Sequence, residues 1–421
     1  MTGGAVLRFL RGHVRWGVVA LLFFTAMLNN LDRMVLSVLA PVLKDALSFG
    51  DIEYSYIVAS FLAAYALGYL FCGRLLDRVG VKVGLMAALL FWSFAGMGHA
   101  AAVGWLSLAA FRFLLGLGES FNSPGGVKAI SEWIPRRERG LCMAVFSNGN
   151  VLGSILAPPL VAFLSLRFGW RCAFLVTGGL GLLLWAVWRR SYHSPESHPR
   201  LTADERALIL ADRQGGSAAR QDERLSVLSL LRQPQCAGFF IARLLTDPIT
   251  YFLVFWMPNY LKEGRGFSLA LIGAVAWIPF LASDIGGPGG GAASDWLVRR
   301  GWTPRKARLA LMLFAALCTP AALIAVFTPD ARVSVACIAV VLGAQSCWMA
   351  NQLTLISESV PRAQVASLLA FSAIGGSLGG IAANLLAGRV IAAVGYVPVF
   401  CTLGFCHLLA FAVLSVTGGR R

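Results

Sequence analysis

The chain has 421 residues, of which 57% are apolar and 13% charged, and its mean hydropathy is +0.71. A soluble domain normally carries about 25% charged residues, so this composition excludes an ordinary water-soluble protein. The net charge of +16 would suit a nucleic-acid-binding protein, but the basic residues gather in short joints between long apolar segments. That placement argues against a nucleic-acid partner.

Apolar segments long enough to cross a bilayer follow one another along the chain. A membrane-spanning helix needs about 20 predominantly apolar residues, and such segments alternate here with short polar joints. The expected spans are 16–40, 54–75, 81–102, 105–127, 140–166, 170–188, 236–261, 268–293, 306–327, 332–355, 365–391 and 396–416. The sequence therefore predicts an all-α membrane protein with twelve transmembrane helices in contact with the lipid bilayer.

Basic residues are distributed unevenly between the two sets of joints. The joints on one side of the expected topology, together with both chain ends, hold most of them: Arg8, Arg11, Arg15, Arg74, Arg78, Lys82, Lys128, Arg136, Arg137, Arg139, Arg299, Arg300, Arg305, Lys306, Arg420 and Arg421. Cytoplasmic loops of membrane proteins are enriched in Lys and Arg. We therefore expect both termini to be cytoplasmic.

A long polar segment, from about Arg189 to Gln233, separates six expected spans from the other six. We expect residues 1–190 to form the first six-helix half, 191–234 a cytoplasmic linker, and 235–421 the second half. Within the linker, Thr202 and Glu205 have the spacing of a capping box, which predicts a short interfacial helix. A plain solvated linker is the alternative.

The two halves repeat each other in sequence. At one constant offset, nine residues of the first half recur in the second: Ser131, Glu132, Pro135, Arg136, Ala144, Gly149, Gly153, Ile155 and Ala157 match Ser357, Glu358, Pro361, Arg362, Ala370, Gly375, Gly379, Ile381 and Ala383. Duplicated, pseudo-symmetric six-helix halves are typical of transporters that rock about a central site. A duplicated membrane enzyme or a channel would leave the repeated joints unexplained.

Motifs for metals, cofactors and catalysis are missing from the sequence. The nine cysteines are scattered single residues without metal-ligand spacing, so we expect neither a metal site nor a disulfide framework. The glycine-rich run 286–291 lacks the Lys-Ser or Lys-Thr of a phosphate-binding loop and lies within an apolar span. We expect a helix break or close packing there, no cofactor, and no enzymatic activity.

Charged residues within the expected spans are few, and each costs at least about 2.5–3.5 kcal/mol to insert at mid-membrane. Asp32 and Arg33 lie in the first span, and Arg112 and Glu119 lie nearly two turns apart on one face of the fourth. A guanidinium can bind a carboxylate through two parallel hydrogen bonds, whereas a buried carboxyl can exchange a proton. Ion pairs that lock helices together, Arg33 with Glu119 or Arg112 with Asp32, are the alternative.

Neutral polar residues within the spans could contact the hydroxyl groups of a ligand. We name Tyr65, Asn150, Asn351 and Gln352, with Ser372 and Asn384 as weaker candidates. For Asn351 and Gln352, hydrogen bonding between helices is an equally good interpretation. Three further charged residues have no assigned role: Arg243 and Asp247 are one turn apart and could pair with each other, and Asp284 has no evident partner.

The segment 73–82 resembles the signature joint of the major facilitator superfamily, with Gly73, Asp77 and Arg78 as its conformational motif. Further segments resemble the anion:cation symporter branch, especially its hexuronate and galactonate-type sugar-acid transporters: 32–33, 112–119, 131–135, 247–248, 256–258 and 277–279. The resemblance implies proton-driven uptake of a small organic anion across a bacterial inner membrane, by a monomer.

The resemblance also implies roles for single residues. Carboxyl groups at the positions of Asp32 and Glu119 act in proton coupling in the related symporters, and Arg33 matches an anion-binding arginine. Tyr65 and Asn150 match binding positions, although galactonate-type carriers have glutamine in place of Asn150. Hexuronates, aldonates and other small carboxylates remain open as substrates. Organic-anion or phosphate-linked antiport, or efflux, is the alternative function.

Overall fold

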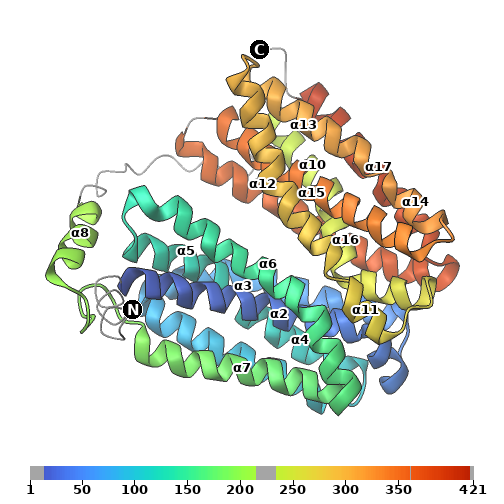
Figure 1. Ribbon diagram of the computed structural model, residues 1–421, viewed down its shortest axis with the longest axis horizontal. Helices are drawn as coiled ribbons and strands as arrows, with labels where there is room; N and C mark the ends of the chain where they lie inside the picture. Colours follow the sequence, from blue (N-terminus) through green and yellow to red (C-terminus); the bar gives the residue numbers. More distant parts are fainter. Residues whose placement is uncertain (1–13, 215–233, 361, 418–421) are drawn as a thin grey trace, which may run out of the picture. The chain divides into compact units, whose positions relative to one another are not determined.

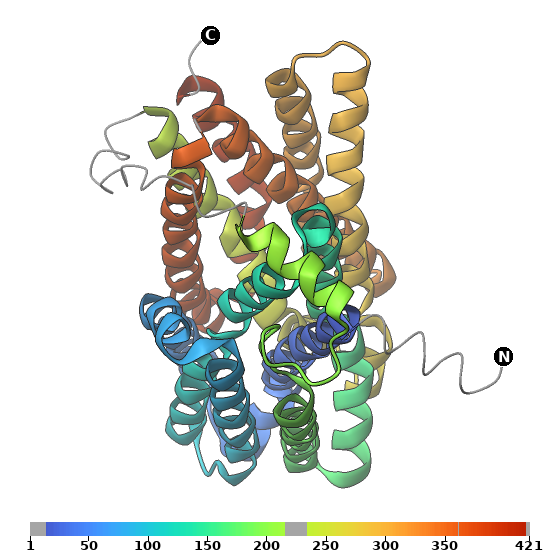
Figure 2. The same cartoon turned by 90° about the vertical axis from the view of Figure 1, so that its left-hand side faces the viewer.

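The computed structural model describes residues 14–214, 234–360 and 362–417, and these residues form helices without any strand (Figure 1, Figure 2). Ten of the described helical segments are long and apolar enough to cross a membrane. Both chain ends and residues 215–233 of the linker lie outside the described residues, so the cytoplasmic location of the termini remains a prediction.

The helices follow the apolar segments of the sequence. In the first part of the chain they are α2 (Val14–Leu47), α3 (Asp51–Gly98), η1 (His99–Ala101), α4 (Trp105–Glu119), α5 (Asn122–Trp133), α6 (Arg136–Phe168), α7 (Trp170–Ser191) and α8 (Ala203–Gln214). The second part contains α10 (Pro234–Asn259), η2 (Tyr260–Gly264), α11 (Leu269–Val275), α12 (Ile278–Arg299), α13 (Pro304–Cys318), α14 (Ala321–Phe327), α15 (Ala331–Ser359), α16 (Arg362–Val394) and α17 (Val397–Thr417).

The ten long segments are consistent with the twelve expected spans. Helix α3 contains the second and third spans, and it is interrupted by Gly80, whose φ of 78° lies in the left-handed region that glycine adopts without strain. The fourth span is divided between α4 and α5, which are each too short to be counted among the ten.

The described residues form two compact units. Unit 1 comprises Met1–Leu36, Ser60–Ala157 and Leu164–Gln221, and unit 2 comprises Ser37–Ala59, Pro158–Phe163 and Asp222–Arg421, as far as their residues are described. The end of α2 and the beginning of α3 therefore pack within unit 2, although both helices continue in unit 1. The predicted division at the linker remains a prediction.

The repeated glycines bring equivalent helices into contact in each unit. In unit 1, a Cβ on Gly149 or Gly153 of α6 would collide with backbone carbonyl oxygens of α2. In unit 2, a Cβ on Gly375 or Gly379 of α16 would collide in the same way with carbonyl oxygens of α10. The internal repeat therefore preserves a close helix–helix contact, which small residues permit in membranes.

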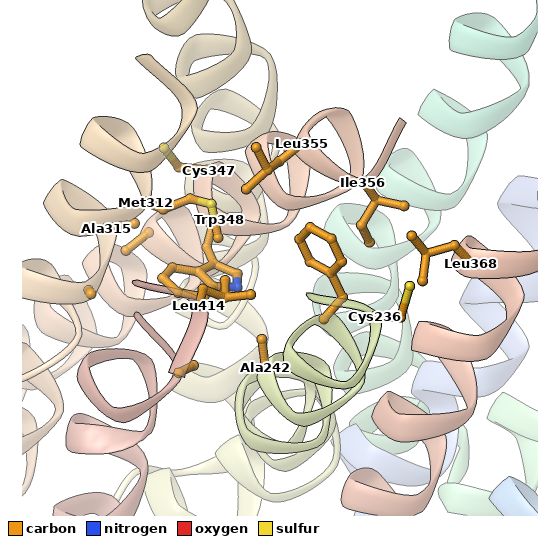
Figure 3. Close-up of a cluster of buried hydrophobic side chains, with 14 of the residues drawn as sticks. Cys236, Ala242, Met312, Ala315, Cys347, Trp348, Leu355, Ile356, Leu368 and Leu414 are labelled. Carbon is orange, nitrogen blue, oxygen red and sulfur yellow. The ribbon is translucent and has the colours of Figure 1, made fainter. Parts of the chain in front are cut away.

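The core of unit 2 is a cluster of buried apolar side chains around Trp348 of α15 (Figure 3). Helix α12 packs on α15 through the glycine-rich run: Gly286 lies against the Gly343 backbone, and Gly290 against Cys347. Because α12 continues through Pro288, the expected helix break is wrong and the alternative, close packing, is correct.

A polar cluster in unit 2 joins the end of α2 to the beginning of α3, to η2 and to the segment before α17. Lys44 is 9% exposed and forms ion pairs with Asp51 and, at 2.7 Å, with Glu263. The hydroxyl of Tyr396 donates to the other oxygen of Glu263 at 2.7 Å. Together these contacts attach the tip of the α2–α3 pair to the rest of unit 2.

The linker helix expected from the capping-box spacing is α8. The Thr202 hydroxyl accepts from the Glu205 backbone N–H at 3.3 Å, which is one of the two hydrogen bonds of a capping box. The Glu205 carboxylate accepts at 3.2 Å from the backbone N–H groups of Val14 and Arg15, so it caps the start of α2. The ring of His198, just before this helix, packs edge-on against Trp133. Burial disfavours the charged imidazolium and so lowers the pKa of His198.

Candidate functional site

The charged residues expected in the first and fourth spans come together in unit 1. Helix α2 carries Asp32 and Arg33, and α4 carries Arg112 and, as its last residue, Glu119. Asp32, Arg112 and Glu119 are 3%, 0% and 0% exposed. Two guanidinium groups and two carboxyl groups are thus gathered within the membrane-spanning part of one unit.

Arg33 and Glu119 form the central ion pair. Nε and Nη2 of Arg33 donate to the same oxygen, Glu119 Oε2, at 3.1 and 3.0 Å. The other oxygen, Oε1, is buried and has no hydrogen-bonding partner among the described residues. The Arg33 side chain remains 22% exposed. The pair therefore leaves part of the guanidinium accessible and one carboxyl oxygen uncommitted.

Arg112 and Asp32 lie beside this pair. Arg112 Nη2 donates to the backbone carbonyl of Arg33 at 2.6 Å, which attaches α4 to α2 next to the ion pair. Both carboxyl oxygens of Asp32 are buried, with the Thr177 hydroxyl beside the carboxyl group and no ion pair to Asp32 within the described residues. A buried carboxylate without an ion-pair partner is costly in a low-dielectric environment. Asp32 is therefore a second group at which a proton could be exchanged.

Aromatic rings of α3 cover the two guanidinium groups. Arg33 Cζ lies 4.9 Å from the ring centre of Tyr65 and 5.1 Å from that of Phe61, and Arg112 Cζ lies 4.9 Å from the same Phe61 ring. Such cation–π contacts hold a guanidinium without using its hydrogen-bond donors. Tyr65 was predicted from the sequence and Phe61 was not, although Phe61 precedes Tyr65 by one helical turn and therefore lies on the same face of the helix.

Asn150 contributes its backbone to the contact between α2 and α6. Its carbonyl oxygen accepts from the Asn30 side chain at 2.6 Å, and Asn30 also bonds to the Ser154 hydroxyl. Asn150 itself is partly exposed. These bonds do not occupy the side-chain amide of Asn150.

The candidates of the second half lie in unit 2 and are mostly engaged in internal hydrogen bonds. Gln352 accepts from Trp348 Nε1 at 2.8 Å and donates to the Phe239 carbonyl at 3.4 Å, so it links α15 to α10. Ser372 donates to the Leu369 carbonyl at 2.8 Å. Asn351 donates to the Cys347 carbonyl at 2.9 Å, and its side-chain oxygen is buried without a described partner.

The conformational motif forms an ion pair in the part of α3 that precedes its interruption at Gly80. Asp77 accepts from Lys128 Nζ at 2.6 Å, and the same ammonium donates to the Leu76 carbonyl at 2.9 Å. In unit 2, Asp295 of α12 is likewise paired, because it accepts from Arg308 of α13 at 2.6 Å. Gly73 and Arg78 lie on the same helix, α3, and Arg78 is exposed.

Within the described residues no group of three or more His, Cys, Asp or Glu side chains could hold a metal ion. The arrangement in unit 1 instead combines a partly exposed guanidinium with buried, incompletely bonded carboxyl groups. Chemically, such a set can bind an organic anion and exchange protons.

Comparisons with known proteins give the family. Residues 22–384 match the Major Facilitator Superfamily. The chain is 33% identical over 273 residues to the galacturonate transporter of Dickeya chrysanthemi, covering 65% of this chain and 79% of the relative. It is 29% identical over 415 residues to the hexuronate transporter of Escherichia coli (strain K12), covering 97% and 94%.

Among solved structures, the D-xylose-proton symporter superposes with a TM-score of 0.74 at 16% identity, covering 95% of this chain and 97% of that one. This similarity shows a shared fold. Because the family match extends over most of the chain and the transmembrane helices agree with it, this protein belongs to the major facilitator superfamily and is a multi-pass membrane transporter, not an enzyme.

Proposed function

We propose that this protein is a secondary transporter that takes up a small sugar acid, a hexuronate or an aldonate, together with protons and by alternating access. The Arg33–Glu119 pair supports the proposal, because a guanidinium, which can bind an anion, lies directly beside a carboxyl group that can exchange a proton. The relatives named for galacturonate and hexuronate support the substrate class.

Competition for Arg33 would couple the anion to the proton. Glu119 takes two hydrogen bonds from Arg33, and a substrate carboxylate needs the same N–H groups for bidentate binding. A proton on Glu119 removes its negative charge and weakens its hold on Arg33. Anion and proton therefore favour each other's binding, which is the linkage that symport requires. Anion affinity is expected to rise as the pH falls.

Two further candidates of unit 1, Tyr65 and Asn150, would contact the ligand's hydroxyl groups. Tyr65 is held against Arg33 by its ring and has a hydroxyl that reaches Tyr69 at 3.2 Å. We assign Tyr65 and Asn150 to hydroxyl recognition, Arg112 to support of Arg33, and Asp32 to proton coupling alongside Glu119. We further propose that the protein works as a monomer in a bacterial inner membrane with both termini in the cytoplasm.

The test is Glu119→Gln, studied in proteoliposomes with an imposed pH gradient and labelled galacturonate. The amide mimics a permanently protonated Glu119, so uphill accumulation should be lost while exchange of labelled for unlabelled substrate persists. Substrate affinity should also become insensitive to pH. Glu138→Gln is the matched control, because it weakens the ion pair of Glu138 with Arg15, which lies near the start of α2.

Accumulation by Glu119→Gln at the wild-type level would remove Glu119 from the coupling mechanism. Wild-type uptake that ignored the pH gradient and required a counter-anion inside the vesicles would favour antiport instead.

A further inference from the structure

Thr177 of α7 is a buried residue that the proposed mechanism does not use. It is 1% exposed, and its hydroxyl lies beside the carboxyl group of Asp32 within unit 1. Asp247 of α10, another buried carboxyl group, pairs with Arg243 one turn earlier at 2.6 Å, as its spacing predicts. Asp32 has no such ion pair within the described residues. Its nearest described source of a hydrogen bond is therefore the neutral hydroxyl of Thr177.

The Thr177 hydroxyl is poorly bonded to its own helix. It donates to the Phe174 carbonyl at 3.5 Å, well beyond the roughly 3.0 Å that O–H···O hydrogen bonds usually reach. Two other buried threonines, Thr25 of α2 and Thr246 of α10, donate to the carbonyl four residues earlier at 2.7 and 2.9 Å. The hydroxyl proton of Thr177 is thus available to a better acceptor, and the Asp32 carboxyl group lies beside it.

Close packing holds this part of α7 in place. Gly178 faces α3 so closely that a Cβ would lie 2.8 Å from the Ser93 carbonyl oxygen. Three residues before Thr177, the Phe174 ring stacks on the ring of His99, with the ring centres 5.0 Å apart. The backbone of Thr177 is therefore fixed on both sides, while its hydroxyl proton can rotate between two acceptors.

Two charged side chains of α4, Glu119 and Arg112, also face Asp32. A negative and a positive neighbour act on a carboxyl group in opposite directions. Thr177 carries no charge, so its hydroxyl adds a hydrogen bond without altering the balance between these two neighbours.

We infer that Thr177 is the positioning residue of Asp32: its hydroxyl donates to the ionised carboxylate and turns to the Phe174 carbonyl when Asp32 takes up a proton. A hydroxyl has one donor and two acceptor lone pairs, so it can also accept from the protonated carboxyl group. Because hydrogen bonds to ionised acceptors are about twice as strong as neutral ones, Thr177 favours the ionised form. This inference rests on the proposed function, in which Asp32 exchanges a proton, and names a residue that sets the pH of that exchange.

The experiment follows the protonation of Asp32 by pH-difference infrared spectroscopy of the purified full-length protein, which needs no substrate. The carboxyl band that is missing in Asp32→Asn belongs to Asp32. Thr177→Val keeps the shape of the side chain and loses the hydroxyl, so the protonation midpoint should move by about one unit to higher pH, a roughly tenfold tighter binding of the proton. Thr177→Ser keeps the hydroxyl and should titrate like the wild type. Thr25→Val is the control and should leave the midpoint unchanged, since that hydroxyl is bonded to its own helix.

A role in packing alone would give the opposite order, because valine fills the space of threonine and serine does not. An unmoved midpoint in folded Thr177→Val, or an equal shift in Thr177→Ser, would overturn the assignment. If the valine variant does not fold, Thr177→Ala is compared with Thr177→Ser, because the two differ in the hydroxyl.

Uptake of labelled galacturonate at different external pH values separates this inference from the proposed function. The pH profile of uptake should shift in Thr177→Val in the same direction as the infrared midpoint. A shifted midpoint with an unchanged profile would support the role of Thr177 but remove Asp32 from proton coupling. If the wild type did not take up galacturonate at all, the proposed function would fail, whereas the infrared result would still decide the role of Thr177.

Discussion

At the scale of single residues, the site depends on how Arg33 divides its interactions. Its hydrogen bonds go to Glu119, while its flat faces lie near the rings of Phe61 and Tyr65. A lysine ammonium could form an ion pair with Glu119, but it has neither the planar fork nor the flat faces. The residue type therefore matters more here than the charge.

Arg33→Lys should bind galacturonate about 10- to 100-fold more weakly than the wild type, because hydrogen bonds to charged groups contribute about 1.5–3 kcal/mol. Isothermal titration of the purified protein would measure the change. Arg15→Lys is the control, since Arg15 also pairs with a glutamate but lies at the start of α2. Near-normal affinity of Arg33→Lys would move the anion-binding role to another arginine, with Arg112 as the first candidate.

At the scale of helices, close contact through glycine determines which helix backbones can approach one another. Gly153 of α6 faces α2 so closely that a methyl group would collide with the Met27 carbonyl and reach within 3.1 Å of the Leu31 amide nitrogen. The same part of α2 carries Asp32 and Arg33. A shift of α2 would therefore move the charged residues of the site.

Gly153→Ala should destabilise the protein, since overpacking a tight contact costs about 1–3 kcal/mol. The midpoint of thermal unfolding in detergent should fall, and galacturonate affinity should fall with it because Arg33 is displaced. Gly179→Ala on α7 is the matched control, as no heavy atom lies within 4 Å of its Cβ position. A Gly153→Ala protein as stable as this control would contradict the role given to the α2–α6 contact.

At the scale of the whole molecule, the distribution of basic residues predicts which joints face the cytoplasm. Arg189 and Arg190 end α7, just before the linker. By contrast, the joint between α14 and α15 holds no basic residue before Arg332. The positive-inside rule assigns these two joints to opposite sides of the membrane.

Single cysteines placed in a background without reactive native cysteines would test this topology. A cysteine replacing the exposed Ser197 should react with an impermeant maleimide only in inside-out vesicles. A cysteine replacing the exposed Pro329 should react only in right-side-out vesicles. Labelling of both positions from the same side would refute the predicted arrangement and, with it, the cytoplasmic placement of the linker.

The sequence by itself determined the helical fold, the approximate spans and the family, since a lipid environment leaves a long apolar segment little alternative to a helix. It also identified the charged residues of unit 1, because ionisable groups are rare in such segments. The glycine run in α12 shows where local pattern was insufficient: its helix continues because α15 packs closely against it.

Only the tertiary structure decided which charged residues meet. Arg33 and Glu119 are 86 positions apart, and whether Arg33 pairs with Glu119 depends on the packing of α2 against α4, which the spacing of either residue cannot reveal. The same holds for Glu205, whose carboxylate caps α2 from 190 positions away. Local propensity acts over a few residues, whereas these contacts arise when separate helices pack and bring their uncommitted polar groups together.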